Sequence, residues 1–255
     1  MAADRPDPTT SVDEAEWLSR YDPTRWPRPS VTVDLVVMTV LNADLKLLLI
    51  KRGQPPCQGA WALPGGFVEV RNEPHDQGES VDAAAARELE EETGLPDGSS
   101  YLEQLYTFGD PGRDPRTRVI TVAYYALVRP DLAPLVRAGD DAAEAGWVSV
   151  SELAERPVAF DHARIIDVAL RRVRGKIDYA PIAFRLVPEH FTMAELRGVY
   201  EAIKGQSYDP SNFRRRFRRM QTDGIIETAP GKRPVARGRP PRVHRFNLEK
   251  AYFFG

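Results

Sequence analysis

A block of glutamates within the segment RELEEETGL, residues 87–95, constrains this chain more than any other feature. The alanines before the block favour a helix, Ser80 suits its N-cap, and a following glycine suits its end. On such a helix Glu88, Glu91 and Glu92 fall within roughly a 100° arc, and like charges placed this way destabilise a helix. This crowding is expected where a hard divalent cation lies among the carboxylates, since Mg²⁺ prefers oxygen ligands and substrate phosphates.

The glutamate helix and the glycine-rich segment before it resemble the Nudix box. That pattern is Gly, five residues, Glu, seven residues, then Arg-Glu-apolar-x-Glu-Glu-x-Gly-apolar. Glu79 precedes Arg87 by the required spacing, and LPGGFVE at 63–69 matches the glycine-rich lead-in. Twelve residues separate Gly66 from Glu79, and we expect the extra stretch, residues 70–77, to form a loop beside the site. A solvated acidic helix face would predict neither the glycines nor the arginine at this spacing.

The resemblance implies a Nudix α/β/α sandwich and assigns roles to the box residues. Glu88, Glu91 and Glu92 would hold Mg²⁺, which would bridge a diphosphate and activate water. Glu91 and Glu92 are the better candidates for base chemistry, with Arg87 orienting them through Glu79. The lengthened loop leaves open whether the site turns substrate over. For ligand binding, the candidates are Arg52, Gly65, Gly66, Arg113 and Arg116, although an ordinary surface role fits the three arginines equally well.

Charge is distributed very unevenly along the chain. Residues 211–245 hold eleven basic and two acidic side chains, a net charge of +9, whereas the whole chain of 255 residues carries −2. The remainder is therefore strongly acidic. This segregation indicates two tasks, one part holding a metal and the other meeting a polyanion.

The basic part has the pattern of a winged helix-turn-helix. A capping box at Thr192 opens a helix through Lys204, and Asp209 with Pro210 suits the start of a second helix. That second helix places apolar side chains on one face and arginines on the others. A basic hairpin, with its tip at residues 232–241, would form the wing.

Duplex DNA is the partner that this pattern favours. Five arginines in six residues opposite an apolar stripe exceed what solubility requires. RNA or an acidic protein is the alternative polyanion, but no aromatic stacking platform of the RNA-binding kind is evident. The helix start would reach base edges and the hairpin would hold phosphates. The predicted DNA-binding residues are Asn212, Arg214, Arg215, Arg216, Arg218, Arg219, Arg237, Arg239 and Arg242.

The rest of the chain completes the expected organisation. The length suits two domains, and the one cysteine, Cys57, favours a reducing cytoplasm. The N-terminus has no apolar signal core and no apolar run approaches transmembrane length, so we expect no membrane association. Asp161 is expected to cap a helix ended by Gly175, and His162 at its start is more often structural than catalytic. The predicted divisions are a flexible segment (1–28), a Nudix domain (29–156), a linker helix (157–177) and a winged helix domain (178–255).

Together, the two domains resemble the Nudix-related transcriptional regulators of NAD metabolism. The similarity rests on PSVTVD at 29–34, the box, FGDPGRDPR at 108–116, and segments at 191–219 and 238–240. It implies a homodimeric repressor of NAD biosynthesis or salvage genes, bound to palindromic operator DNA and released by ADP-ribose or a related nucleotide. A bifunctional protein, or a plain Mg²⁺-dependent ADP-ribose pyrophosphatase, is the alternative because the box acids are retained.

Overall fold

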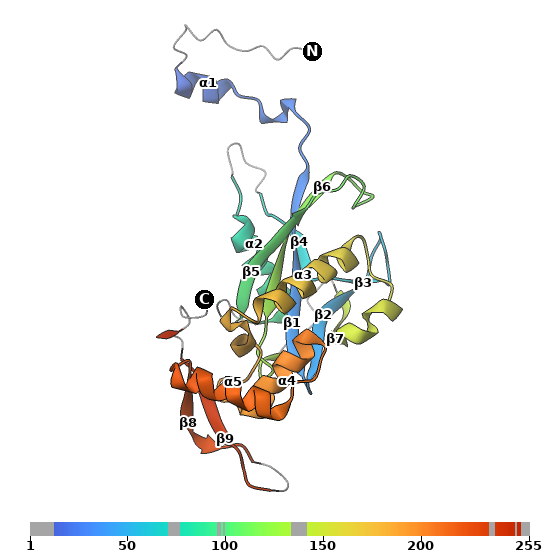
Figure 1. Ribbon diagram of the computed structural model, residues 1–255. Helices are drawn as coiled ribbons and strands as arrows, with labels where there is room; N and C mark the ends of the chain where they lie inside the picture. The colour runs from blue at the N-terminus through green and yellow to red at the C-terminus, as the bar shows by residue number, and fades with distance from the viewer. Residues whose placement is uncertain are drawn as a thin grey trace.

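The computed structural model describes residues 13–70, 77–95, 98, 100–133, 142–234, 238–247 and 249–250. The predicted loop at 70–77 lies outside the described residues except at its two ends. The chain begins with an arm of one α-helix, α1 (Glu14–Arg20), and one 3₁₀ turn, η1 (Pro23–Arg25), which stands away from the body (Figure 1). Among the described residues, no helix has the length and apolar character needed to cross a membrane.

A mixed seven-stranded sheet forms the centre of the N-terminal part. Its main order is β3-β2-β1-β6-β5, with β4 also paired to β1 and β7 to β2. β1 and β6 run parallel, and the other pairs are antiparallel. The strands are β1 (Ser30–Leu41), β2 (Asp44–Arg52), β3 (Trp61–Ala62), β4 (Gly65–Phe67), β5 (Tyr101–Phe108), β6 (Val119–Leu127) and β7 (Ala142–Ser149).

Helices cover both faces of this sheet, as the β1 side chains require. Along β1, Val33, Leu35 and Val37 pack on one side, while Val36 and Met38 pack on the other. This alternation is the period of two that a strand imposes, with both faces buried. The first face is covered by α2 (Val81–Thr93), and the second by α3 (His162–Lys176). The predicted α/β/α sandwich is therefore confirmed.

The ends of α2 agree with the sequence expectation, whereas those of α3 do not. The Ser80 hydroxyl accepts from the Ala83 amide at 3.1 Å, and Gly94 ends α2 in the left-handed conformation. Asp161 stands at the N-cap of α3, but its side chain accepts no capping hydrogen bond. It pairs instead with an arginine 48 residues earlier in the chain. Gly175 does not end α3, because the helix continues to Lys176 within a packed interface.

The C-terminal part forms the predicted winged helix-turn-helix. After the 3₁₀ turns η3 (Val150–Glu155) and η4 (Pro181–Arg185), it contains α4 (Met193–Lys204), α5 (Pro210–Thr222), β8 (Ile226–Lys232) and β9 (Arg242–Phe246). The capping box at Thr192 is present, and the Asp209 side chain accepts from the Asn212 amide at 2.8 Å. One apolar core runs from the α3 side of the sheet through α4 into the buried face of α5 (Figure 1). The two parts thus share a core through α3 and α4.

Candidate functional site

Two glycines shape the approach to the α2 carboxylates. Gly65 has φ +146°, and a Cβ there would lie 2.2 Å from the carbonyl oxygen of Val33 on the neighbouring strand. A Cβ on Gly66 would lie 2.2 Å from Oε1 of Glu88. The glycine-rich lead-in therefore leaves the space in which the Glu88 carboxylate sits against β4.

Arg87 is the centre of the box, and its guanidinium contacts three glutamates. Nε and Nη2 donate to the two carboxylate oxygens of Glu79, at 3.2 and 2.6 Å. Nη1 donates to Glu88 at 2.8 Å and to Glu91 at 3.0 Å. Nη2 also donates to the carbonyl of Phe67 at 3.1 Å, which ties α2 to the end of β4. The predicted contact between Arg87 and Glu79 is present, and it is bidentate.

The three glutamates occupy different electrostatic environments. The hydrogen bonds from Arg87 lower the pKa of Glu79. Burial raises the pKa of Glu88, and Arg87 offsets only part of that effect. Glu91 is exposed on the outer side of α2. Burial therefore makes charging Glu88 costly, and a cation beside it is what keeps the carboxylate ionised.

The expected convergence of Glu88, Glu91 and Glu92 on a metal is not found. In the part of the chain that the structure describes, no group of three Asp, Glu, His or Cys side chains is arranged to hold an ion. The reason is that Nη1 of Arg87 bonds both Glu88 and Glu91, so a guanidinium takes the place expected for the cation. The carboxylate oxygens suit a divalent ion chemically, but this arrangement does not fit one.

Arg113 is buried, which corrects its expected role as a phosphate contact. Its side chain is only 6% exposed, and it donates to Asp161 at 2.8 and 3.1 Å and to Asp34 at 3.2 Å. Burial opposes the charge, yet the two aspartates raise its pKa above the ordinary value. Arg113 therefore joins β1 to the start of α3. No local pattern signalled this, since the three residues lie far apart in the sequence.

The other two predicted ligand arginines lie nearer to solvent. Arg116 is 47% exposed, pairs with Asp114 and lies 5.7 Å from the ring of Phe67. Arg52 is half-buried, donates to the carbonyl of Pro56 at 2.8 Å and lies 4.9 Å from the ring of Phe160. Arg116 is therefore the predicted ligand arginine that lies beside β4 and the box.

His162 completes the buried junction at the start of α3. Its Nδ1 accepts from the Leu63 amide at 2.9 Å, and its Nε2 lies 3.5 Å from Asp34. Burial lowers its pKa, so the ring is neutral at neutral pH. Leu63 directly precedes the box lead-in, so this histidine connects α3 to the loop that forms the site.

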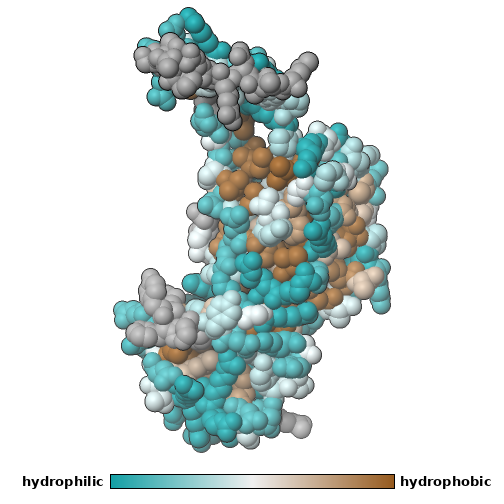
Figure 2. All heavy atoms as spheres, turned by 45° about the horizontal axis from the view of Figure 1, so that its top comes forward, coloured by the Kyte–Doolittle hydropathy of each residue, from teal (hydrophilic) through white to brown (hydrophobic). Residues whose placement is uncertain are grey.

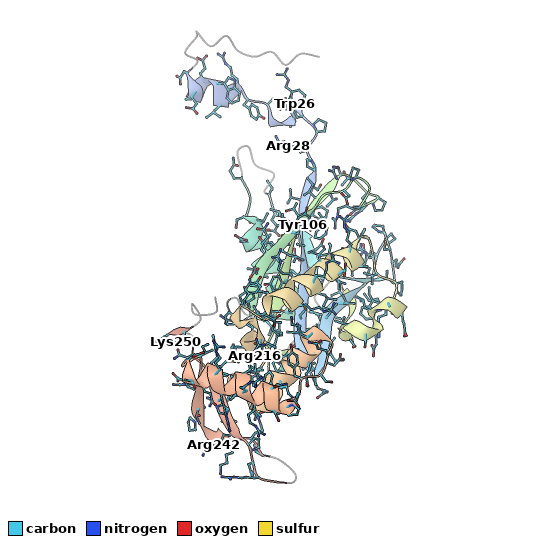
Figure 3. The ribbon with its side chains drawn as sticks, viewed as in Figure 1. Trp26, Arg28, Tyr106, Arg216, Arg242 and Lys250 are labelled. Carbon is cyan, nitrogen blue, oxygen red and sulfur yellow. The ribbon has the colours of Figure 1, made fainter. Side chains whose placement is uncertain are left out.

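The basic surface lies on α5 and the wing, at the end of the molecule opposite the arm (Figure 3). α5 buries Phe213, Phe217 and Met220 and exposes most of its arginines to solvent. The Nη2 of Arg215 donates to Asn212 at 3.2 Å, which orders the start of the helix. Of the predicted DNA contacts, the structure brings together on these exposed surfaces Asn212, Arg214, Arg215, Arg218, Arg219, Arg239 and Arg242. Arg237 lies outside the described residues.

Arg216 is an exception among the α5 arginines, because it faces the protein. Its Nη2 donates to the Tyr200 hydroxyl at 3.2 Å, and its guanidinium carbon lies 4.4 Å from that ring. Nη1 lies 3.9 Å from Asp178, which also pairs with Lys204 at 2.5 Å. Arg216 therefore holds α5 to α4 and to the segment after α3, and its expected DNA contact is corrected.

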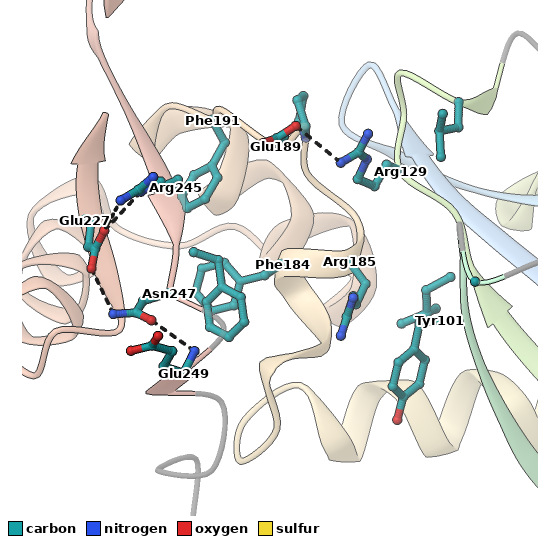
Figure 4. Close-up of a pocket in the computed structure, with 15 residues that line it drawn as sticks. Tyr101, Arg129, Phe184, Arg185, Glu189, Phe191, Glu227, Arg245, Asn247 and Glu249 are labelled. Carbon is teal, nitrogen blue, oxygen red and sulfur yellow. Dashed lines mark hydrogen bonds and ion pairs between the residues drawn. The ribbon is translucent and has the colours of Figure 1, made fainter. Parts of the chain in front are cut away.

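A cavity of about 760 Å³ lies between β5, β6, η4 and the wing (Figure 4). Arg245 of its lining is paired with Glu227 at 2.8 Å, and Arg129 lies 4.0 Å from Glu189. Its cations are thus largely matched by acids from the same walls. This lining does not include the box, so we place the nucleotide site at the box and not in this cavity.

Known proteins share both halves of this architecture. The model of the NUDIX domain matches residues 31–169, and that of the NrtR DNA-binding winged helix domain matches residues 183–246. The chain is 34% identical over 236 residues to the ADPR responsive transcriptional repressor NtrR of Acinetobacter baylyi, covering 92% of this chain and 89% of that protein. It is 40% identical over 147 residues to the ADP-ribose pyrophosphatase of Methanocaldococcus jannaschii, covering 58% and 76%.

A solved structure extends the similarity to the whole arrangement. Shewanella oneidensis NrtR, crystallised with a 27mer DNA, superposes with a TM-score of 0.72 at 30% identity, covering 87% of this chain and 95% of that one. The fold and the two sites define a class of protein in which a Nudix domain is joined to a winged helix DNA-binding domain. Within that class, the chain belongs to the NrtR family, as the sequence predicted.

Proposed function

We propose that this protein is a transcriptional repressor that binds operator DNA and is released by ADP-ribose. One observation carries the proposal: an arginine-covered recognition helix shares a continuous core with a domain that bears a Nudix box. The A. baylyi relative is described as an ADPR responsive repressor, and the S. oneidensis relative was crystallised with DNA. Such a role requires a cytoplasmic protein, and the target genes suggested by the family resemblance belong to NAD biosynthesis or salvage.

The DNA contact is made by the start of α5 and by the wing. Asn212 and Arg215 lie at the N-terminal end of α5, where a recognition helix reaches base edges in the major groove. Arg214 and Arg218 are exposed farther along the helix, and Arg242 is exposed on β9 (Figure 3). These side chains neutralise phosphates and set the position of the helix on the duplex. A homodimer presents two such helices to a palindromic operator.

ADP-ribose binds beside the box, and the signal passes through α3. A ligand changes DNA affinity only if it binds the two states of the protein differently. The segment containing Arg113 and the β4 end both border the box, and Arg113 contacts Asp161 at the start of α3. Along α3, Arg172 donates to the Leu105 carbonyl of β5 and Arg174 donates to the Ile203 carbonyl of α4. A shift at the start of α3 is therefore transmitted to the helix that supports α5.

The test begins with an operator selected by the protein from a pool of random duplexes. Fluorescence anisotropy then measures binding with and without ADP-ribose. We expect ADP-ribose to weaken DNA binding by about 5- to 150-fold, the usual size of an allosteric coupling. An unchanged dissociation constant at saturating ADP-ribose would refute the sensing role.

The DNA-contact residues are tested by the salt dependence of binding. Replacing Arg214 and Arg218 by alanine is expected to lower the slope of log K against log salt by about 0.9 for each lost phosphate contact. Arg171→Ala is the matched control, because Arg171 is an exposed arginine on α3 and not on α5. Equal slopes for the double variant and the wild type would remove α5 from the interface.

Mg²⁺-dependent hydrolysis of ADP-ribose is a second candidate function. The retained box glutamates and the similarity to an ADP-ribose pyrophosphatase favour it. The carboxylate oxygens of Glu88, Glu91 and Glu92 are the ligands that Mg²⁺ prefers. Incubation with ADP-ribose and Mg²⁺ or Mn²⁺, followed by analysis for AMP and ribose phosphate, tests this activity. Release of both products, abolished by Glu92→Gln, would establish the bifunctional protein, and no release would leave a pure sensor.

A further inference from the structure

The arm formed by residues 13–28 exposes an unusual amount of apolar surface. Trp17 is 51% exposed, Leu18 53%, Tyr21 49% and Trp26 63%. α1 buries none of its residues. The interactions described for the arm stay within it, including the stacked rings of Trp17 and Tyr21 at 5.1 Å. Figures 1 and 3 show the arm standing clear of the body, with Trp26 near its base.

An arm of this kind requires a surface to pack against. A helix of seven residues is not stable in water by itself, and helices in proteins depend on packing of their apolar face. A buried aromatic side chain covers about 150–250 Å². The exposed fractions of the arm therefore amount to roughly 400 Å² of apolar side chain, which is at the upper end of what monomeric proteins expose in one patch.

The base of the arm explains why its own body does not receive it. Pro27 and Pro29 flank Arg28. Proline fixes its own φ and disfavours the helical conformation in the residue before it, so this connection is extended and stiff. The chain then enters β1 at Ser30 without a turn. The geometry directs the arm outward, toward a second molecule.

An apolar patch suited to receive the arm lies at this same base. Val31 is 37% exposed, Phe67 46% and Val70 61%. They are adjacent, because Thr32 pairs with Phe67 and the Val68 amide donates to the Val31 carbonyl. Figure 2 shows apolar surface on the body directly below the arm. A two-fold axis close to this base would allow each copy to offer its arm to the patch of the other.

We infer that residues 13–28 dock on the patch formed by Val31, Phe67 and Val70 of a second copy of this chain, so that two copies exchange arms. Two arms and the surfaces they cover would bury about 1,600 Å², the size of a stable protein–protein interface. The exchange also reaches the nucleotide site, since the Phe67 carbonyl accepts a hydrogen bond from Arg87. The inference rests on the homodimer of the proposed function, and it needs neither DNA nor ADP-ribose binding.

Sedimentation equilibrium of the full chain tests the arm directly. The variant with Trp17→Ser, Tyr21→Ser and Trp26→Ser is expected to raise the dimer dissociation constant at least 100-fold. Val70→Asp, on the receiving patch, is expected to raise it as well. Tyr179→Ser is the matched control, because Tyr179 is 57% exposed in the turn after α3, and it is expected to change the constant less than twofold. A triple variant that dimerises like the wild type, or a monomeric wild type, would overturn the inference.

A cross-link between differently labelled copies identifies the occupant. A photoreactive residue replaces Trp26, and ¹⁴N and ¹⁵N copies are mixed before illumination. Cross-linked peptides should join differently labelled chains and map to the segments around Val31 and Val70. Links confined to one chain would overturn arm exchange. A dimer that survives loss of the arm and still binds its operator would refute the arm and leave the repressor standing, whereas an arm-dependent dimer without operator binding would do the reverse.

Discussion

Gly66 controls the box through the space that it leaves empty. Any side chain at this position places a Cβ 2.2 Å from the Glu88 carboxylate, which then has to move away from Arg87. We therefore expect Gly66→Ala to weaken ADP-ribose binding at least tenfold, measured by titration calorimetry. The control is Gly146→Ala, since a Cβ on Gly146 meets nothing within 4 Å. Equal affinities for the two variants would show that the position of Glu88 does not matter for the ligand.

His162 should give the folded protein a stability that depends on pH. Burial lowers its pKa below 6.5 in the folded state, while nearby Asp34 and Asp161 raise it and Arg113 and Arg52 lower it. The unfolded chain therefore binds the proton more tightly. Its contribution to stability is full above pH 6.5 and is lost as pH falls toward the folded pKa, by up to about 1.4 kcal/mol per pH unit.

Urea unfolding between pH 5 and pH 8 measures this effect. We expect His162→Asn to remove most of the loss of stability below pH 6.5, since asparagine can accept the Leu63 amide and does not titrate. His244 is also buried with a lowered pKa and changes stability in the same direction, so the comparison with the wild type isolates His162. Parallel pH profiles for the two proteins would contradict the prediction.

Single residues differ in how far the sequence could predict them. The pairing of Arg87 with Glu79 was predictable, because the box fixes their spacing and both belong to one local unit. The burial of Arg113 was not, since its partners come from β1 and from the start of α3. Its charge suggested a phosphate contact, and only the tertiary fold shows that two aspartates already neutralise it.

At the scale of elements, α5 has two kinds of arginine. Arg216 lies on the Tyr200 ring and near Asp178, whereas Arg214 is exposed. We expect Arg216→Ala to lower the free energy of unfolding by about 1–2 kcal/mol, because it loses a hydrogen bond and a cation–π contact. Arg214→Ala should leave stability unchanged within about 0.5 kcal/mol. Urea unfolding measures both values, and a larger loss for Arg214→Ala would reverse the assignment.

Element boundaries were predictable where a local cap determines them. Ser80, Thr192 and Asp209 each accept the backbone hydrogen bond that their sequence positions indicated. The α3 boundaries failed at both ends, for one physical reason. Asp161 serves an ion pair in place of a cap, and Gly175 remains helical because the surrounding packing outweighs its low propensity.

The whole molecule behaves as one body because α3 belongs to two interfaces. Its apolar face packs against the sheet, and the same core continues into α4 and α5. At its end, Lys176 pairs with Glu103 of β5, and Asp178 just beyond pairs with Lys204 of α4. The sequence indicated an amphipathic helix here, but it did not indicate that both of its ends are held by charged groups.

The α3 connection predicts that the two sites can be uncoupled without destroying either. Asp161→Asn removes the charge that holds Arg113 to the start of α3 but keeps the shape of the side chain. We expect it to bind DNA like the wild type, to bind ADP-ribose less than tenfold more weakly, and to lose most of the ADP-ribose effect on DNA. Asp167→Ala is the control, since Asp167 is an exposed acid on the same helix.

Thermodynamic linkage makes this prediction strict. ADP-ribose must change DNA affinity by the same factor by which DNA changes ADP-ribose affinity. Anisotropy titrations at saturating ADP-ribose, and calorimetric titrations at saturating operator, measure the two factors independently. In Asp161→Asn both factors should fall toward one together, while both stay at the wild-type value in Asp167→Ala. Wild-type coupling in Asp161→Asn would mean that the signal reaches α5 by a route that does not include Arg113 and α3.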